Sequence, residues 1–173
     1  PRYYRPSLTL DRSGKVLVAC SSQYAILAWD THTWADIFRL DTQEVHRHVY
    51  SLSPDGTSLV TASEDIQTEV WDLTSGRIRF AYQDVAHTTS VVVSDDHAHI
   101  VCGTSEGFVH VRDGRTGRLE ATWRVSEFPI GMVRLDRSGR RILSVAGGGS
   151  ESPYSEVKIW ALSTSQCLGT FVA

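Results

Sequence analysis

The chain has 173 residues, of which 41% are hydrophobic and 21% are charged, and its formal net charge is -3 at pH 7. This composition is typical of a globular domain that is large enough to bury a core. The small negative charge disfavours a nucleic-acid binder, which usually carries a basic excess or stripe, and no apolar stretch is long enough for a membrane helix.

A repeated turn sequence divides the chain into four similar segments. The run Leu-Asp-Arg-Ser-Gly at residues 10–14 recurs letter for letter at 135–139, Leu-Ser-Pro-Asp-Gly occupies 52–56, and a weaker copy occupies 93–97. The copies end at residues 14, 56, 97 and 139, so they are 42, 41 and 42 residues apart. Internal repeats of this length indicate a repeat architecture such as a propeller.

Short β-rich runs surround each turn. In the first segment they lie near residues 8–10, 16–18, 26–28 and 37–38, and the other three segments repeat the arrangement. Apolar residues alternate with polar ones at a period of two, which is typical of strands, and no helical periodicity is present. We therefore predict an all-β fold with four antiparallel strands in each repeat. Such sheets can cover both faces by stacking around an axis, as in a β-propeller.

A second landmark follows each turn and carries a resemblance to a known family. Trp29-Asp30, Trp71-Asp72 and Arg112-Asp113 each begin 15 residues after the end of the turn, whereas Trp160-Ala161 begins 21 residues after it. Together with the Ser-Pro-Asp-Gly turn, this pattern resembles the WD-repeat family over nearly the whole chain. The resemblance implies a propeller of four WD-type blades.

The repeats depart from the family pattern in several places. The family's Gly-His pair is absent, although His46 and His87 stand at the equivalent position. Only the second repeat has a full candidate for the family's hydrogen-bonded set, which consists of His46, Ser63, Asp65 and Trp71. Arg112 replaces the usual Trp in the third repeat, where we expect either a carboxylate partner or an exposed blade edge.

The expected blades cover residues 7–41, 48–83, 88–125 and 130–173 of a single segment, 1–173. WD-repeat rings commonly have more blades than four, so the chain forms either a compact ring or an arc of a larger one, and we favour the arc. The missing initiating Met also favours a fragment. Further blades of the parent chain, or a second copy, would then cover apolar residues of the end blades: Leu8, Leu10, Leu17, Val18 and Ile26 in the first, and Leu135, Ile142, Leu143, Val157 and Ile159 in the last.

We expect no catalytic, cofactor or metal site. Two His pairs, 46/48 and 97/99, offer two ligands each without an accompanying cluster. The glycine run at 147–149 lacks the Lys and the helix of a phosphate-binding loop, and we interpret residues 146–155 as a flexible inserted loop. No Gly-x-Ser-x-Gly nucleophile motif occurs.

The resemblance implies a scaffold or adaptor that binds other proteins or peptides, because WD-repeat proteins usually bind around the central opening of one ring face. The candidate contact residues on that face are Arg47, Tyr50, Glu64, Glu106, Phe128, Glu151 and Tyr154. Two alternatives stay open: a sensor region of a larger nucleotide-switch protein of the NACHT or NB-ARC type, and a propeller hydrolase. We expect neither a nucleic-acid nor a membrane partner.

Three widely spaced cysteines, Cys20, Cys102 and Cys167, form no disulfide framework. We interpret them as free thiols in a reducing compartment. The expected location is therefore the cytoplasm or the nucleus.

Overall fold

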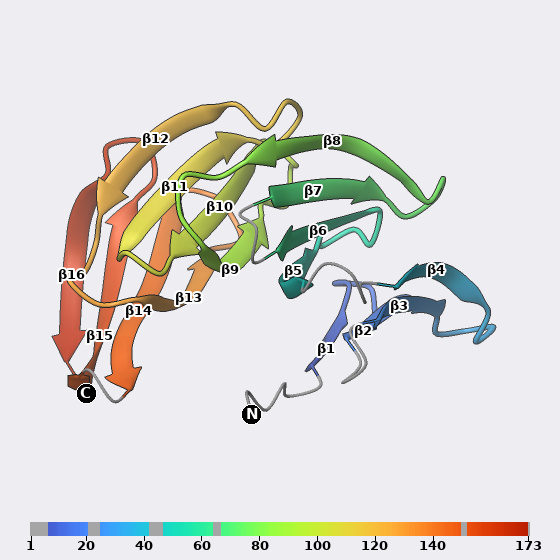
Figure 1. Cartoon of the computed structure of the whole chain (residues 1–173), viewed down its shortest axis with the longest axis horizontal. Coiled ribbons are helices and arrows are strands. Elements are labelled where there is room, and N and C mark those ends of the chain that lie inside the picture. The colour runs from blue at the N-terminus through green and yellow to red at the C-terminus, as the bar shows by residue number, and fades with distance from the viewer. Residues whose placement is uncertain (1–6, 21–24, 42–46, 64–66, 150–151, 173) are drawn as a thin grey trace.

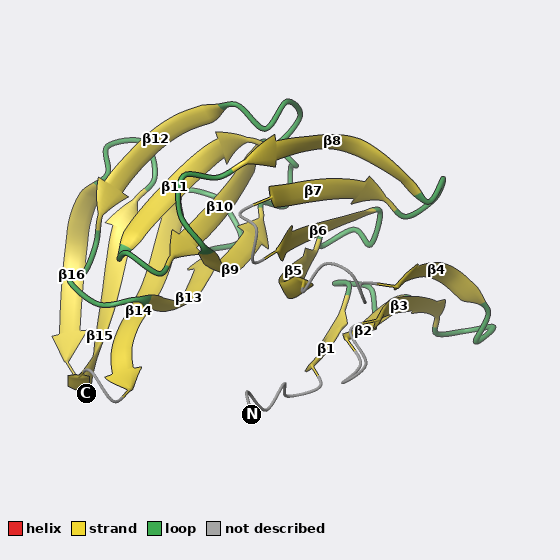
Figure 2. Ribbon diagram, in the orientation of Figure 1, coloured by secondary structure: helices red, strands yellow, loops and turns green. Residues whose placement is uncertain are grey.

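A computed structural model describes residues 7–20, 25–41, 47–63, 67–149 and 152–172, which form sixteen strands and no helix. Figure 2 shows only strands and loops in this part of the chain. The strands form four four-stranded antiparallel sheets, one for each repeat, which confirms the predicted strand pattern. Accordingly, the described residues include no helix that is long and apolar enough to cross a membrane.

Each sheet consists of four strands that are consecutive in the chain. The first sheet contains β1 (Ser7–Leu10), β2 (Val16–Cys20), β3 (Ala25–Asp30) and β4 (Asp36–Asp41). The second contains β5 (Arg47–Leu52), β6 (Ser58–Ser63), β7 (Gln67–Asp72) and β8 (Arg77–Gln83). The third contains β9 (Thr88–Val93), β10 (His99–Thr104), β11 (Phe108–Asp113) and β12 (Leu119–Arg124). The fourth contains β13 (Ile130–Leu135), β14 (Arg141–Gly149), β15 (Ser152–Ala161) and β16 (Gln166–Val172).

The four sheets follow one another in a curved row (Figure 1). The first strand of each sheet (β1, β5, β9 and β13) lies on the inner side of the row, and the last strand (β4, β8, β12 and β16) lies on the outer side. The first and fourth sheets lie at the two ends of the row. In the third sheet, the turn between the second and third strands lies against the connection from the second sheet, since the Ser105 amide donates to the His87 oxygen at 2.9 Å.

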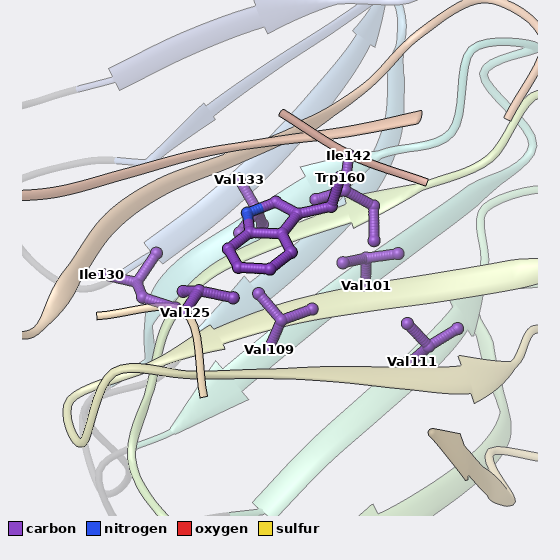
Figure 3. Close-up of a cluster of buried hydrophobic side chains, with 8 residues drawn as sticks. All are labelled: Val101, Val109, Val111, Val125, Ile130, Val133, Ile142 and Trp160. Atoms are coloured by element: carbon purple, nitrogen blue, oxygen red, sulfur yellow. The ribbon is translucent and has the colours of Figure 1, made fainter. Parts of the chain in front are cut away.

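The apolar core is divided into three clusters, each shared by two successive sheets. Residues of the first and second sheets form one cluster, and residues of the second and third form another. The cluster between the third and fourth sheets contains Val101, Val109, Val111, Val125, Ile130, Val133, Ile142 and Trp160 (Figure 3). Neighbouring residues of one strand serve different clusters, because successive side chains point to opposite faces: Leu59 packs toward the first sheet and Val60 toward the third.

The two end sheets differ in part from the sequence-based expectation. Leu8 and Leu10 are exposed, at 72% and 56%, in line with an uncovered first sheet. Val18, Ile26 and Ile142 are instead fully buried, because they point inward to the neighbouring sheet. The period-two pattern identifies a strand but does not tell which of two apolar faces is the covered one.

The four repeated turns share one backbone conformation. Their last residues have positive φ angles of 72° at Gly14, 75° at Gly56, 56° at His97 and 67° at Gly139. Glycine adopts this left-handed region without strain, which explains its recurrence. A carboxylate closes the turn, as where Asp11 accepts hydrogen bonds from the backbone amides of Ser13 at 3.0 Å and Val16 at 2.7 Å.

The inserted segment of the fourth repeat is not a loop along its whole length, and this corrects the expectation for residues 146–155. β14 and β15 continue through most of it as an extended hairpin, with Ala146 opposite Glu156 and Gly147 opposite Ser155. A register shift between Gly147 and Gly149 accommodates the glycines, which tolerate the irregular backbone of a bulge.

Candidate functional site

Contacts at the Trp position join successive sheets. The Trp71 ring lies edge-on to Phe38 of the first sheet, with ring centroids 5.4 Å apart. The Trp160 ring lies 6.2 Å from Trp123 of the third sheet. Aromatic pairs in such tilted arrangements stabilise beyond the area they bury. In the second and fourth sheets, the repeated Trp therefore packs against an aromatic residue of the preceding sheet's outer strand.

Each of these two Trp side chains also donates a hydrogen bond within its own sheet. The Trp71 indole donates to the Thr61 hydroxyl at 3.1 Å, and the Trp160 indole donates to the Ser144 hydroxyl at 3.0 Å. These bonds join the third strand of the sheet to its second strand. Thr61 was not among the residues predicted from the sequence, although its hydroxyl group ten positions before Trp71 could have indicated this hydrogen bond.

The third sheet has Arg112 at the Trp position, and this side chain keeps the contact between sheets by different chemistry. Its guanidinium carbon lies 4.1 Å from the ring centroid of Tyr82 on the outer strand of the second sheet. It donates to the Asp84 carboxylate at 2.7 Å and to the Gly117 carbonyl oxygen at 2.9 Å. Arg112 is 5% exposed, so the carboxylate partner, and not an exposed edge, accounts for it.

Asp84 is the centre of a buried polar network between the second and third sheets. It also accepts hydrogen bonds from the hydroxyls of Thr68 at 2.8 Å and Thr88 at 3.2 Å, and His110 Nδ1 lies 4.0 Å away. Burial alone would raise the pKa of Asp84, but the nearby His110 imidazole, the hydrogen bond from Thr68 and the charge of Arg112 outweigh it and lower the pKa below 3.8. The network therefore holds an ionised carboxylate, which we interpret as a structural element.

Cys102 lies beside this network and is fully buried. Burial is the main cause that raises the pKa of its thiol to about 12, and its sulfur lies 3.8 Å from the Tyr82 hydroxyl. A thiol with so high a pKa is a poor nucleophile at neutral pH. Among the described residues, no group of three or more His, Cys, Asp or Glu is placed to hold a metal ion.

The predicted hydrogen-bonded set is described only in part. His46 and Asp65 lie outside the described residues. Ser63 ends β6, and its hydroxyl donates to the backbone oxygen of Gln67 at 2.9 Å, while Trp71 donates to Thr61 as above. The expected link from His46 to Ser63 or Asp65 stays a prediction.

Two predicted contact residues, Glu106 and Phe128, lie close to each other at the junction of the third and fourth sheets. The turn at Glu106 and Gly107 packs on residues 125–128, because the Gly107 oxygen accepts hydrogen bonds from the amides of Val125 at 2.9 Å and Ser126 at 3.3 Å. A side chain at Gly107 would meet the backbone oxygens of Ser126 and Phe128. We call residues 106–107 and 125–128 the rim cluster.

Side chains of the fourth sheet hold the rim cluster in place. Glu156 accepts a hydrogen bond from the Ser126 hydroxyl at 2.9 Å, and Lys158 donates to the Val125 oxygen at 2.8 Å. Lys158 also pairs with Glu156 at 3.0 Å. Hydrogen bonds from Lys158 and Ser126 lower the pKa of Glu156. Tyr154 lies on the same strand, β15, and is 62% exposed.

The remaining predicted contact residues are more dispersed. Tyr50 is half-buried and lines a hollow on the inner side of the row of sheets. Arg47 belongs to β5, but its side chain lies outside the described part of the structure, as do Glu64 and Glu151. The structure therefore brings Glu106 and Phe128 together and places Tyr50 apart from them.

No protein-family model matches the chain. Eukaryotic translation initiation factor 3 subunit I of Mycosarcoma maydis is 30% identical over 140 residues, which are 79% of this chain and 38% of that protein. THO complex subunit 6 of Arabidopsis thaliana is 30% identical over 129 residues, which are 69% of this chain and 32% of that protein. Both are distant homologues of WD-repeat type. The chain spans well under half the length of each relative.

A solved structure has the same fold. A chain of Kuenenia stuttgartiensis hydrazine synthase superposes with a TM-score of 0.81 over 96% of this chain and 48% of that chain. Its identity of 17% means that the likeness shows the fold alone. That fold is propeller-like.

Proposed function

We propose that the chain is a protein-interaction scaffold built from WD-type propeller blades. The observation that carries the proposal is the match to two relatives over 79% and 69% of the chain, each of which is a subunit of a larger assembly by its name. The buried ion pair of Asp84 and Arg112 joins the second and third sheets and so helps to hold the blades of this scaffold together. Its three free cysteines fit an intracellular setting.

We further propose that the four sheets are an arc of a larger ring. The propeller-like chain of hydrazine synthase is about twice as long as this one and contains the same arrangement, since the superposition covers 96% of this chain but 48% of the other. Leu8, Leu10 and Phe171, on the two end sheets, are 72%, 56% and 61% exposed. Covering apolar side chains such as these on a further blade is favourable at about 25 cal/mol per Å² of apolar area.

The rim cluster and Tyr154 are the partner-binding surface that we propose. An exposed aromatic ring and a rigid loop are common anchors at interfaces. The hydrogen bonds from Ser126 and Lys158 fix the loop before a partner arrives, which lowers the entropy lost on binding.

Affinity purification of the full-length protein from its own cells, followed by mass spectrometry, tests the proposal. Glu106→Arg combined with Tyr154→Ala should remove the main partners. The matched control, Thr122→Ala, changes an exposed residue of the outer strand β12 and should retain them. Recovery of no protein above a tag-only background would overturn the scaffold proposal, and equal recovery by all variants would overturn the assignment of this surface.

A further inference from the structure

Four equivalent positions meet on the inner side of the row of sheets. Thr9, Ser51, Val92 and Arg134 each lie five residues before the last residue of their turn, and all four line one hollow of about 410 Å³. The other lining residues are apolar or carry hydroxyl groups, so Arg134 is the one charged residue among the described lining residues. The fourth repeat therefore places a cation where the others place Thr, Ser and Val.

The charge of Arg134 is available to a ligand. Its guanidinium donates one hydrogen bond, to the neighbouring Val133 oxygen at 2.8 Å. An arginine has five N–H donors, so most of them remain for a partner. No ion pair joins Arg134 to a carboxylate within the described part of the chain.

The turn that follows Arg134 extends this positive charge to the surface. Arg137, Arg140 and Arg141 are all exposed. Segment 134–141 thus holds four arginines and one carboxylate, Asp136, and four minus one gives a net charge of three. Asp136 is occupied by the turn itself, since it accepts hydrogen bonds from the amides of Arg140 at 2.8 Å and Arg141 at 3.0 Å.

The equivalent turns of the other sheets present fewer such cations: Lys15 of the first turn, at the position equivalent to Arg140, is exposed. Arg12 of the first turn forms a bidentate pair with Asp95 of the third. Asp55 of the second turn lies 2.9 Å from the His97 imidazole of the third. Arg12 and Asp55 thus join one sheet to another, whereas the exposed arginines of the fourth turn have no such partner among the described residues.

We propose that segment 134–141 and the hollow bind an acidic segment of a protein partner. One carboxylate of that segment pairs with Arg134 in the hollow, and others lie along Arg137, Arg140 and Arg141. Arginine is suited to this role because its planar fork donates two parallel hydrogen bonds to a carboxylate. The assignment rests on the proposed scaffold function and names the chemistry of one partner.

A nucleic acid fits this surface less well than an acidic peptide does. The whole chain has a net charge of -3, and the carboxylates Asp55, Asp95 and Asp96 lie on the neighbouring turns. A continuous phosphate backbone would pass these carboxylates, whereas nucleic-acid binders present a continuous basic stripe. A short acidic peptide can bind the arginines of the fourth sheet without extending over these carboxylates.

Fluorescence anisotropy with the full-length protein tests the assignment. The probe is a labelled peptide of alternating glutamate and glycine, and the matched probe has glutamine in place of glutamate. We expect binding of the glutamate peptide alone, weakened by added salt. Arg134→Gln should weaken it about tenfold, and the triple change Arg137→Gln, Arg140→Gln and Arg141→Gln should weaken it at least as much. Arg39→Gln, at an exposed arginine of β4 outside the surface, should leave it unchanged.

Three results would overturn the assignment: equal binding of the glutamine peptide, equal binding by Arg134→Gln with an unchanged denaturation midpoint, or tighter binding of a polyuridine oligonucleotide. These outcomes are separable from failure of the scaffold proposal. If the full-length protein recovers partners from its cells but does not bind the glutamate peptide, the acidic-segment assignment alone fails.

Discussion

Arg112 shows how a single residue of a repeat can change while its contacts are kept. Trp71 and Trp160 pack on aromatic rings of the preceding sheet and donate to hydroxyls of their own sheet. Arg112 packs on the Tyr82 ring, but it donates to Asp84 on the connection between the second and third sheets. The substitution therefore replaces an apolar anchor by a cation, and the buried carboxylate balances its charge.

The pair of Asp84 and Arg112 leads to a stability prediction. Asp84→Asn leaves the Arg112 guanidinium buried without its counter-charge, so we expect the free energy of unfolding to fall by about 3–5 kcal/mol. The control Asp41→Asn breaks the exposed pair with Arg39 and should cost less than about 1 kcal/mol. Urea unfolding measures both changes, and equal losses in the two variants would contradict the buried ion pair.

The same carboxylate gives a pH dependence with a defined sign. The pKa of Asp84 in the folded chain lies below its ordinary value of 3.8, so the unfolded chain takes up a proton first as the pH falls. The stabilisation from ionised Asp84 is thus complete above about pH 5 and is lost as the pH falls through the folded-state pKa. The difference in unfolding free energy between the wild type and Asp84→Asn should narrow below pH 4. A difference that stays constant down to pH 2 would show that Asp84 contributes no such dependence.

At the scale of elements, the sequence predicts the strands well. It predicts less well which face of a strand is buried and which side chains of different sheets are in contact. Period-two alternation and the recurring turn were sufficient to predict four antiparallel strands in each repeat. They were not sufficient to orient Val18 and Ile26, since both faces of these strands carry apolar residues. The contacts of Asp84 with Thr68, Thr88 and Arg112 join residues that are 16, 4 and 28 positions apart and come from two sheets. The contacts with Thr68 and Arg112 are too distant in the sequence for a local pattern to encode them.

The inserted hairpin illustrates a second limit. A run of glycines suggested a loop at residues 146–155, because glycine is costly to order. Pairing between β14 and β15 supplies the hydrogen bonds that order this backbone through Gly147 and Gly149. A run of glycines indicates only that the backbone is conformationally free. Whether it is ordered as a strand depends on the residues of the opposite strand, which the run itself does not show.

A substitution at Gly107 tests whether the packing within the rim cluster is needed for stability and partner binding. This glycine has a φ of 82°, and a Cβ atom would lie 2.1 Å from the Ser126 oxygen. Gly107→Ala should therefore displace residues 125–128, lower the free energy of unfolding by about 1–3 kcal/mol and reduce partner recovery. In the control Gly131→Ala, the new Cβ atom would have only the Val145 oxygen near it, at 3.8 Å. This change should leave the free energy of unfolding and the partner recovery unchanged. Normal partner recovery by Gly107→Ala would count against the rim cluster.

At the scale of the whole molecule, stability depends on the stacking of sheets and not on any one sheet. Each apolar cluster takes residues from two successive sheets, so the two middle sheets are covered on both faces. The first and fourth sheets each have one neighbour within the curved row. An arc of this kind is most stable when its ends are covered, which is the physical basis for proposing a larger ring.

Sedimentation velocity of the 173 residues alone tests this central claim most directly. The monomer has a mass of 19.2 kDa. We predict that the chain sediments as a dimer or a larger assembly, because Leu8, Leu10 and Phe171 on its end sheets would otherwise stay in water. A stable species of 19.2 kDa that does not self-associate at high concentration would contradict the account, because the four sheets would then need no further blade.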